Sequence, residues 1–243
     1  GSDVIGQWIF DPAGFNGTPP TGYSALSQDN LDAGSSKITS WAWIKNRDAT
    51  YYHHLADTVR GITRGINSNA NDAENNYSNI TAVYEHGFKV GSAELVNKSG
   101  QNLVAWCWKA GGSSTVSNTD GDQTTQVSLN EEAGFGIVTY TGTGSNTNIG
   151  HGLGAVPDMI ITKSRSATGS WAVLDKFNTT AEYGFFLNDN GGYSSYQGGT
   201  FWNDTPPTST VFRVGTNSAT NASGVTYVAY CWKSIPGFSK IGK

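Results

Sequence analysis

Two 22-residue stretches of this chain are half identical, and this internal similarity limits the folds open to it more than any other feature. Residues 88–109 align with residues 212–233 at a constant offset of 124, with 11 identical positions out of 22. Further upstream, residues 41–50 align with residues 159–168 at an offset of 118. A period of this length exceeds that of solenoid repeats, so each copy is expected to be a domain or half-domain. A tandem of similar units is more typical of a surface or binding module than of an enzyme, whose catalytic constellation is usually single.

The composition indicates an all-β protein of the extracellular or virion kind. Only 14% of the residues are charged, 12% are aromatic, and there are 31 glycines. Short apolar runs alternate with turn clusters at intervals of about 8–12 residues, which is typical of a sandwich or jelly roll. We therefore expect an all-β fold with two tandem antiparallel β-sandwich units, jelly-roll or lectin-like, that arose by internal duplication. The strand expected at 103–108 is apolar on both faces, so it should be central in its sheet.

Shifts in composition set the expected boundaries. Residues 1–36 are a Pro- and Gly-rich lead, and residues 37–112 are the first β-sandwich copy. Residues 113–132 are rich in Gly, Ser, Thr and Asp, so we expect a connection there, with one edge strand at 124–129. Residues 133–243 are the second copy. Within the lead, Gly22-Tyr-Ser-Ala-Leu26 is a weak echo of Gly134-Phe-Gly-Ile-Val138.

Charge and hydropathy exclude two classes of partner. The formal net charge of −4 gives no attraction to phosphate, so no nucleic acid is expected. No apolar run is long enough for a membrane span, so no membrane insertion is expected.

The two cysteines, Cys107 and Cys231, occupy equivalent positions and are either two reduced core thiols or a bridge between the copies. The opening Gly1-Ser2 is typical of a cloning remainder, which predicts that the chain is a fragment.

Several sequence blocks, in the same order, resemble a module that recurs in structural proteins of tailed phages, marine phages above all. The blocks are WIKNRDA (43–49), DTVRG (57–61), HGFKVGS (86–92), VAWCWKAGG (104–112), VSLNEEAGFGIVTYTGTGSN (127–146), IGHGLGAVPDMIITKSR (149–165) and YVAYCWKSIPGFSKIG (227–242). The lead, with VIGQWIF (4–10) and TPPTGYSAL (18–26), resembles the last strand of a SPRY-like lectin-type sandwich. The resemblance implies a virion component, such as a tail fibre or tail tip, and carries no catalytic residues.

Aromatic residues outside the strong strands are the candidate ligand contacts. Sugar sites in β-sandwiches stack an aromatic ring on the apolar face of the sugar, with Asn and Asp supplying hydrogen bonds. The candidates are Tyr51, Tyr52, Tyr193, Tyr196, Trp202, Asn203 and Asp204. The other interpretation is that these rings cover hydrophobic edges or form a subunit contact.

The sequence predicts neither a metal centre nor a cofactor. His53 and His54 face opposite ways in a strand, and a zinc site needs further ligands. Calcium is the one alternative that the oxygen-rich stretches 118–122 and 188–190 leave open, although turn chemistry explains both. No G-x-S-x-G nucleophile elbow is present. A polysaccharide depolymerase that uses two carboxylates stays open as an alternative.

The leading hypothesis is a non-enzymatic module of a phage virion appendage that attaches to the host surface, through carbohydrate binding. The expected partners are a host cell-surface glycan or protein and other virion proteins. A homo-oligomer is expected, with the trimers of phage fibres as the analogy. The alternatives are a purely structural spacer or decoration protein, and the depolymerase.

Overall fold

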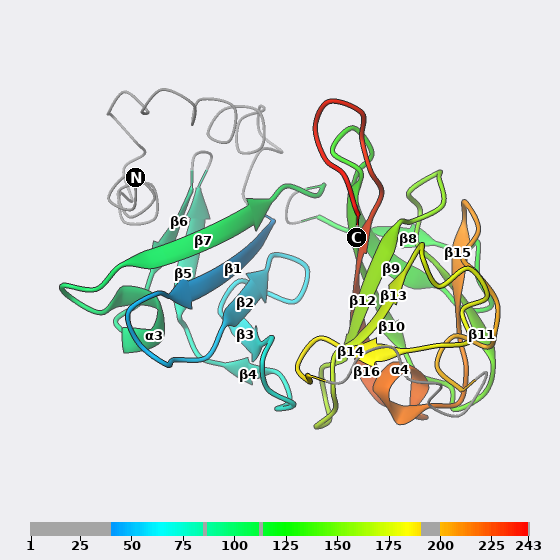
Figure 1. Ribbon diagram of the computed structural model, residues 1–243, viewed down its shortest axis with the longest axis horizontal. Helices are drawn as coiled ribbons and strands as arrows, with labels where there is room; N and C mark the ends of the chain where they lie inside the picture. Colours follow the sequence, from blue (N-terminus) through cyan, green and yellow to red (C-terminus); the bar gives the residue numbers. More distant parts are fainter. Residues whose placement is uncertain (1–39, 85–86, 112–113, 191–199, 243) are drawn as a thin grey trace. The chain divides into compact units, whose positions relative to one another are not determined.

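The computed structural model describes residues 40–84, 87–111, 114–190 and 200–242, and antiparallel β-strands dominate it (Figure 1). The predicted all-β fold class is confirmed. The chain forms two compact units, which we call unit 1 (1–68 and 75–114) and unit 2 (69–74 and 115–243). Each unit is described by itself.

Unit 1 contains a five-stranded antiparallel sheet in the order β4-β3-β2-β1-β7, a separate β5-β6 hairpin and one helical turn, α3. The strands are β1 (Trp41–Asn46), β2 (His54–Asp57), β3 (Arg64–Asn67), β4 (Asn75–Asn76), β5 (Ile80–Tyr84), β6 (Gly87–Val90) and β7 (Leu103–Trp108), and α3 is Glu94–Asn97. Side chains alternate across a strand, so Ala42 and Ile44 of β1 lie on one face, where they join a core with Phe88 and Val96. Trp41, Trp43 and Lys45 lie on the other face.

Unit 2 is larger, and its seven-stranded antiparallel sheet has the order β14-β13-β12-β16-β10-β9-β8. Its strands are β8 (Val116–Asn118), β9 (Thr125–Asn130), β10 (Phe135–Thr141), β11 (Thr147–Gly150), β12 (Met159–Ser164), β13 (Ala172–Asp175), β14 (Phe185–Phe186), β15 (Val211–Val214) and β16 (Thr226–Trp232), and α4 is Ser218–Asn221. The β11-β15 pair forms a second, two-stranded sheet.

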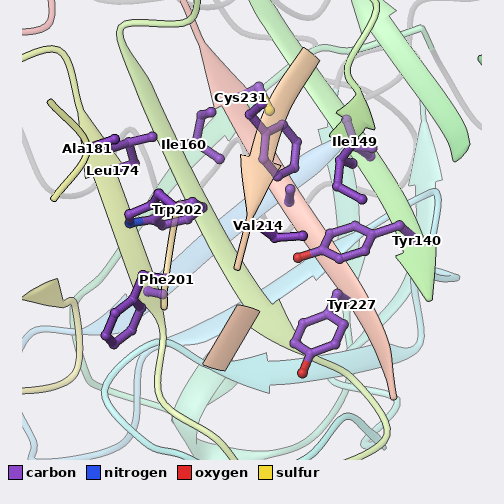
Figure 2. Packing of buried hydrophobic residues seen from close by; sticks show 14 of the residues in the cluster. Tyr140, Ile149, Ile160, Leu174, Ala181, Phe201, Trp202, Val214, Tyr227 and Cys231 are labelled. Carbon is purple, nitrogen blue, oxygen red and sulfur yellow. The ribbon is translucent and has the colours of Figure 1, made fainter. Parts of the chain in front are cut away.

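The core of unit 2 lies between these two sheets. Figure 2 shows Ile149 of β11 and Val214 of β15 beside Tyr140 of β10 and Tyr227 of β16. The rings of Tyr140 and Tyr227 are stacked, with centroids 5.1 Å apart. Each phenol donates to a carbonyl of α4, Tyr140 to Thr220 at 2.7 Å and Tyr227 to Ser218 at 2.6 Å. Both buried hydroxyls are therefore satisfied, as burial of a polar group requires.

The aligned stretches of sequence occupy equivalent structural positions. In unit 1, Trp41 lies opposite Asp57 on one side and Trp108 on the other; in unit 2, Met159 lies opposite Asp175 and Trp232. These are the partners that the offsets of 118 and 124 predict. The backbone hydrogen bond made by the residue before the strand also recurs. Ser40 N, before β1, donates to Trp108 O, and Asp158 N, before β12, donates to Trp232 O. The two sheets share their register, while the origin of that likeness by duplication stays a prediction.

The loops that follow β2 and β13 are also capped in the same way. Asp57 Oδ1 accepts a hydrogen bond from the backbone N–H of Arg60 at 2.8 Å, and Asp175 Oδ1 accepts one from Asn178 at 3.3 Å. A carboxylate that receives the N–H of the turn closes the loop locally. The aspartate matched by the 118-residue offset is therefore a turn-forming residue in both units.

Two details differ from the expectation. The stretch 113–132 is more than a connection, because β8 and β9 lie in it and extend the sheet of unit 2 beyond β10, so the units divide near residue 114. The strand β7 was expected to be central, but among the described residues it pairs with β1 alone and ends its sheet (Figure 1). Its counterpart β16 is central, between β12 and β10.

Candidate ligand-binding surface

One of the predicted ligand contacts, Trp202, does not have the exposed placement that was expected for it. Trp202 is 0% exposed and lies in the core cluster of unit 2, as Figure 2 shows. A ring with no accessible face cannot stack on a sugar, so the prediction for Trp202 is wrong. The physical reason is that Trp202, although it lies next to a turn in the sequence, packs against the apolar side chains of the unit 2 core.

Asn203 and Asp204 shape the turn that follows Trp202. Both have positive φ, 54° and 45°, and the N–H of Thr205 donates to the carbonyl of Trp202 at 3.2 Å. Positive φ at both central positions with this hydrogen bond defines a type I′ turn, which favours Asn and Asp. Asn203 and Asp204 are therefore explained by backbone geometry without a ligand. Tyr193 and Tyr196 lie outside the described residues.

Tyr51 and Tyr52 remain, and they lie in the loop between β1 and β2. The Tyr51 hydroxyl donates to Glu94 Oε2 of α3, while Lys98 Nζ donates to the Tyr51 oxygen at 3.1 Å and to Glu94 Oε2 at 3.0 Å. The Lys98 amine also lies 5.5 Å from the centroid of the Tyr51 ring. We call Tyr51, Glu94 and Lys98 the tyrosine cluster. The hydrogen bond from Tyr51, and then the Lys98 amine, lower the pKa of Glu94, so this carboxylate is charged at neutral pH.

The loop that carries the two tyrosines is anchored by its own side chains. Lys45 Nζ donates to the carbonyls of Ala49 at 2.8 Å and Tyr51 at 3.0 Å. Asn46 Oδ1 accepts from the N–H groups of Asp48 and Ala49. These bonds fix the loop before any ligand arrives, which lowers the entropy that binding must overcome.

Tyr52 is 53% exposed, the largest exposed fraction of any aromatic ring among the described residues. The next residue, His53, lies beside Trp43, with ring centroids 6.2 Å apart. Trp43 in turn contacts Trp106 of β7, which is 44% exposed, at a centroid distance of 5.8 Å. An aromatic strip therefore runs over the face of the sheet opposite the core of unit 1. We call His53, Trp43 and Trp106 the aromatic strip.

Trp106 is a candidate that reasoning from the sequence missed. It aligns with Tyr230 at the 124-residue offset, and Tyr230 is 0% exposed. The candidates were sought among aromatic residues outside the strong strands, so Trp106 in β7 was not one of them. The signal that could have found Trp106 is the tryptophan spacing of β1 and β7, which places Trp41, Trp43, Trp106 and Trp108 on one face.

The tyrosine cluster is specific to unit 1. At the offsets of the two copies, Tyr51, Glu94 and Lys98 correspond to Gly169, Ser218 and Ala222. A group of side chains needed only for the fold is expected in both units, but the tyrosine cluster is present in unit 1 and absent at the corresponding positions of unit 2. The difference favours a role for the cluster beyond folding.

Each of the three histidines that the structure describes, His53, His54 and His151, has local contacts of its own. His54 is buried beside Asn79, whose amide nitrogen lies 3.3 Å from His54 Nδ1, while His53 lies on the opposite face. Burial, and then the charge of Arg60, lower the pKa of His54 to about 4, so it is neutral at pH 7. His151 Nδ1 accepts from the Leu153 N–H, which leaves Nε2 to donate to the carbonyl of Thr208. In the part of the chain that the structure describes, no group of three His, Cys, Asp or Glu residues is placed to hold a metal ion.

The oxygen-rich stretch 118–122 uses its side chains for local structure. Asp122 accepts from the N–H of Asn148 at 2.8 Å and from its side-chain amide at 3.1 Å. The Asn118 side chain bonds both the backbone N–H and the carboxylate of Asp120. These contacts fit the turn interpretation of the sequence.

Cys107 and Cys231 are both free thiols, and burial raises the pKa of each, so both are protonated at neutral pH.

The fold and this surface define an all-β protein of two antiparallel units, one of which presents a fixed loop of aromatic and charged side chains. The chain belongs to the family described as a domain of unknown function (DUF7483), whose profile matches residues 20–243. No curated protein and no solved structure shows significant similarity to it. None of the helices in the described ranges has the length and apolar character needed to cross a membrane.

Proposed function

We propose that this protein is a non-catalytic attachment module of a tailed-phage virion appendage, which binds a host cell-surface glycan through Tyr52, the tyrosine cluster and the aromatic strip. The sequence blocks that resemble phage structural proteins support the virion setting. The observation that carries the binding role is Tyr52, a ring more than half exposed on a loop that is already fixed.

The chemistry of the surface supports a sugar as the ligand. An exposed ring offers its face to the C–H groups of a pyranose, and neighbouring polar groups receive the hydroxyls. Glu94 can accept hydrogen bonds from sugar hydroxyls and Lys98 can donate to them, and both side chains are partly exposed. Because Glu94 and Lys98 neutralise each other, the cluster favours a neutral sugar over a strongly charged one.

One such site gives weak binding. A single exposed ring with a few hydrogen bonds corresponds to a dissociation constant on the order of a millimolar, or about 4 kcal/mol. Many copies on one virion raise the apparent affinity by roughly 100-fold or more without a new contact. Weak single sites are therefore compatible with firm attachment of the particle.

The test is binding of the labelled full chain to cells of candidate hosts, with free sugars as competitors. We expect saturable binding that a sugar competes away, and a loss of about tenfold or more in Tyr52→Ala, since the ring contributes at least ~1.4 kcal/mol. Tyr183→Ala is the matched control: Tyr183 is a 40% exposed tyrosine in unit 2 and should bind as the parent does.

Three outcomes would contradict the proposal. Equal loss in both variants would remove the assignment of the site. No binding to any host by the folded chain would favour the structural alternative, a spacer or decoration protein. New reducing ends in the host polysaccharide would show an enzyme instead.

A further inference from the structure

Strand β7 is an exception among the edges of the two large sheets. The other strands that end these sheets in the described residues are two or three residues long: β4, β14 and β8. Short edge strands are a common protection against unwanted pairing. β7 has six residues, LVAWCW, and none is charged. A long, apolar, uncharged edge is expected to be covered by another strand.

The unused hydrogen-bonding groups of β7 can be identified from its pairing with β1. Arg47 N donates to Asn102 O at 2.8 Å, which places this pair in the hydrogen-bonded set, and every second pair along the ladder belongs to the same set. Val104 and Trp106 therefore bond to β1. The N–H and C=O groups of Leu103, Ala105 and Cys107 point to the other side, where the described residues place no strand.

Unit 2 shows what occupies that side. The counterparts of Leu103, Ala105 and Cys107 are Tyr227, Ala229 and Cys231 of β16. They lie opposite Tyr140, Val138 and Gly136 of β10. The bonds Gly142 N to Val225 O and Lys233 N to Gly134 O, at 2.8 Å each, place these pairs in the hydrogen-bonded set. The edge that β10 covers in unit 2 is thus the edge of β7 at which the described residues of unit 1 place no strand.

The turn beyond α4 holds the segment that follows β10. Asn221 accepts on Oδ1 from Thr143 N at 2.8 Å and donates from Nδ2 to Ser145 O at 2.6 Å. Its carbonyl accepts from Gly144 N, and Gly224 N donates to Gly142 O, both at 2.9 Å. The strand is therefore recognised by its backbone and by the glycine turn that ends it.

The same turn exists in unit 1 with the same shape. Asn97 and Gly100 correspond to Asn221 and Gly224, and the glycines have φ of 74° and 75°. Asn97 Nδ2 donates to Gly91 O, as Asn221 Nδ2 donates to the equivalent Gly215 O. Asn97 is exposed, whereas Asn221 is 0% exposed. The same side chain and glycine turn are therefore present in unit 1, where no described residue buries Asn97.

We propose that the β7 edge and the Asn97–Gly100 turn form a strand-acceptor site, and that its occupant is the stretch around residues 22–26 of the same chain. The length of chain suits this source: β10 ends 18 residues before β12 begins (159 − 141), and 40 residues precede β1. The sequence GYSAL at 22–26 echoes GFGIV at 134–138, where β10 begins. It is also uncharged, as the edge requires.

Backbone amide exchange by NMR on the full chain tests the proposal. We expect Leu103, Ala105 and Cys107 to exchange within about tenfold of Val104 and Trp106, whose amides bond to β1. The amides of Tyr227, Ala229 and Cys231 are the internal standard for a covered edge. Fast exchange at Leu103, Ala105 and Cys107, with protection at Val104 and Trp106, would show an open edge and overturn the site.

A proline variant tests the occupant. Leu26→Pro removes a backbone donor that would face Ala105, because Leu26 matches Val138, which forms a hydrogen-bonded pair with Ala229 in unit 2. It should speed exchange at Leu103, Ala105 and Cys107 by roughly 100-fold or more, with unit 2 unchanged. Ser35→Pro, outside the stretch, is the control and should leave the three amides protected. Protection that survives Leu26→Pro would remove the stretch as occupant. Protection that falls on dilution would show that a second copy supplies the strand instead.

Discussion

Trp202→Ala separates a core role for this residue from a ligand-binding role. The side chain is 0% exposed and lies among Ala181, Phe201 and Leu174 in the core of unit 2. Complete burial of a Trp removes roughly 200 Å² from water, and at about 25 cal/mol per Å² this is ~5 kcal/mol, of which alanine keeps a part. We expect the variant to lose about 4 kcal/mol of unfolding free energy.

Urea unfolding followed by circular dichroism measures this loss. With a slope of about 2 kcal/mol per molar, the transition of unit 2 should move down by about 2 M. The type I′ turn after Trp202 does not depend on the side chain at that position, so the fold should be retained at low urea. Tyr183→Ala, on the surface of the same unit, should shift the midpoint by no more than about 0.3 M. An unchanged midpoint in Trp202→Ala, with weaker host-cell binding, would refute the reasoning and restore Trp202 as a ligand contact.

Three further predictions concern unit 1. Arg60→Ala should destabilise unit 1 by about 3–5 kcal/mol in urea unfolding, because Arg60 Nε lies 2.5 Å from Asp57 Oδ2 with both side chains 0% exposed, and the variant removes this cation from a buried carboxylate. Lys98→Ala, at the exposed pair with Glu94, should change stability little. The pKa of His54 is about 4 in the folded chain and 6.5 in the unfolded chain. Its contribution to the free energy of unfolding, on the order of 3 kcal/mol, is therefore complete above pH 6.5 and is lost as the pH falls from 6.5 to 4. A His54→Gln variant whose free energy of unfolding depends on pH in the same way over this range would exclude His54 as the cause. Gly65→Ala should destabilise unit 1 by about 1–3 kcal/mol in thermal unfolding, because the new Cβ would lie 2.1 Å from His54 Cε1. Gly154→Ala is the control: nothing lies within 4 Å of its new Cβ, so it adds only the strain of its positive φ.

The fold class and the strand positions could be predicted from the sequence because their signal is local. The stretch 103–108 was expected as a strand and is β7. The strand expected at 124–129 is β9 at Thr125–Asn130, although it lies between β10 and β8 and is not at the edge as expected. The alternation of apolar residues and the Gly- and Asn-rich turns are enough for such assignments. The division of the chain was less accurate, since it depends on which sheet β8 and β9 join, and that is decided by long-range pairing.

The candidate site was only partly predictable, because exposure is not a local property. Tyr52 and Trp202 both follow an aromatic residue and both lie outside strong strands, yet one is 53% exposed and the other 0%. The difference comes from what packs against each ring. The partners of Tyr51 show the same limit, since Glu94 and Lys98 lie more than 40 residues away in the sequence.

The difference between β7 and β16 is informative in its own right. β7 and β16 have nearly the same sequence, so a pattern that predicts a central strand for one must predict it for the other. Unit 2 satisfies that prediction, because β16 lies between two neighbours and is buried from Tyr227 to Trp232. In unit 1 the strand has one described neighbour, and Trp106 and Asn97 are exposed where Tyr230 and Asn221 are buried. The two strands have similar sequences but different surroundings. Among the described residues, the outer backbone groups of β7 and the exposed side chain of Asn97 are therefore the groups that a further strand could bind. Both proposals therefore place binding on unit 1 and give unit 2 the role of a closed scaffold.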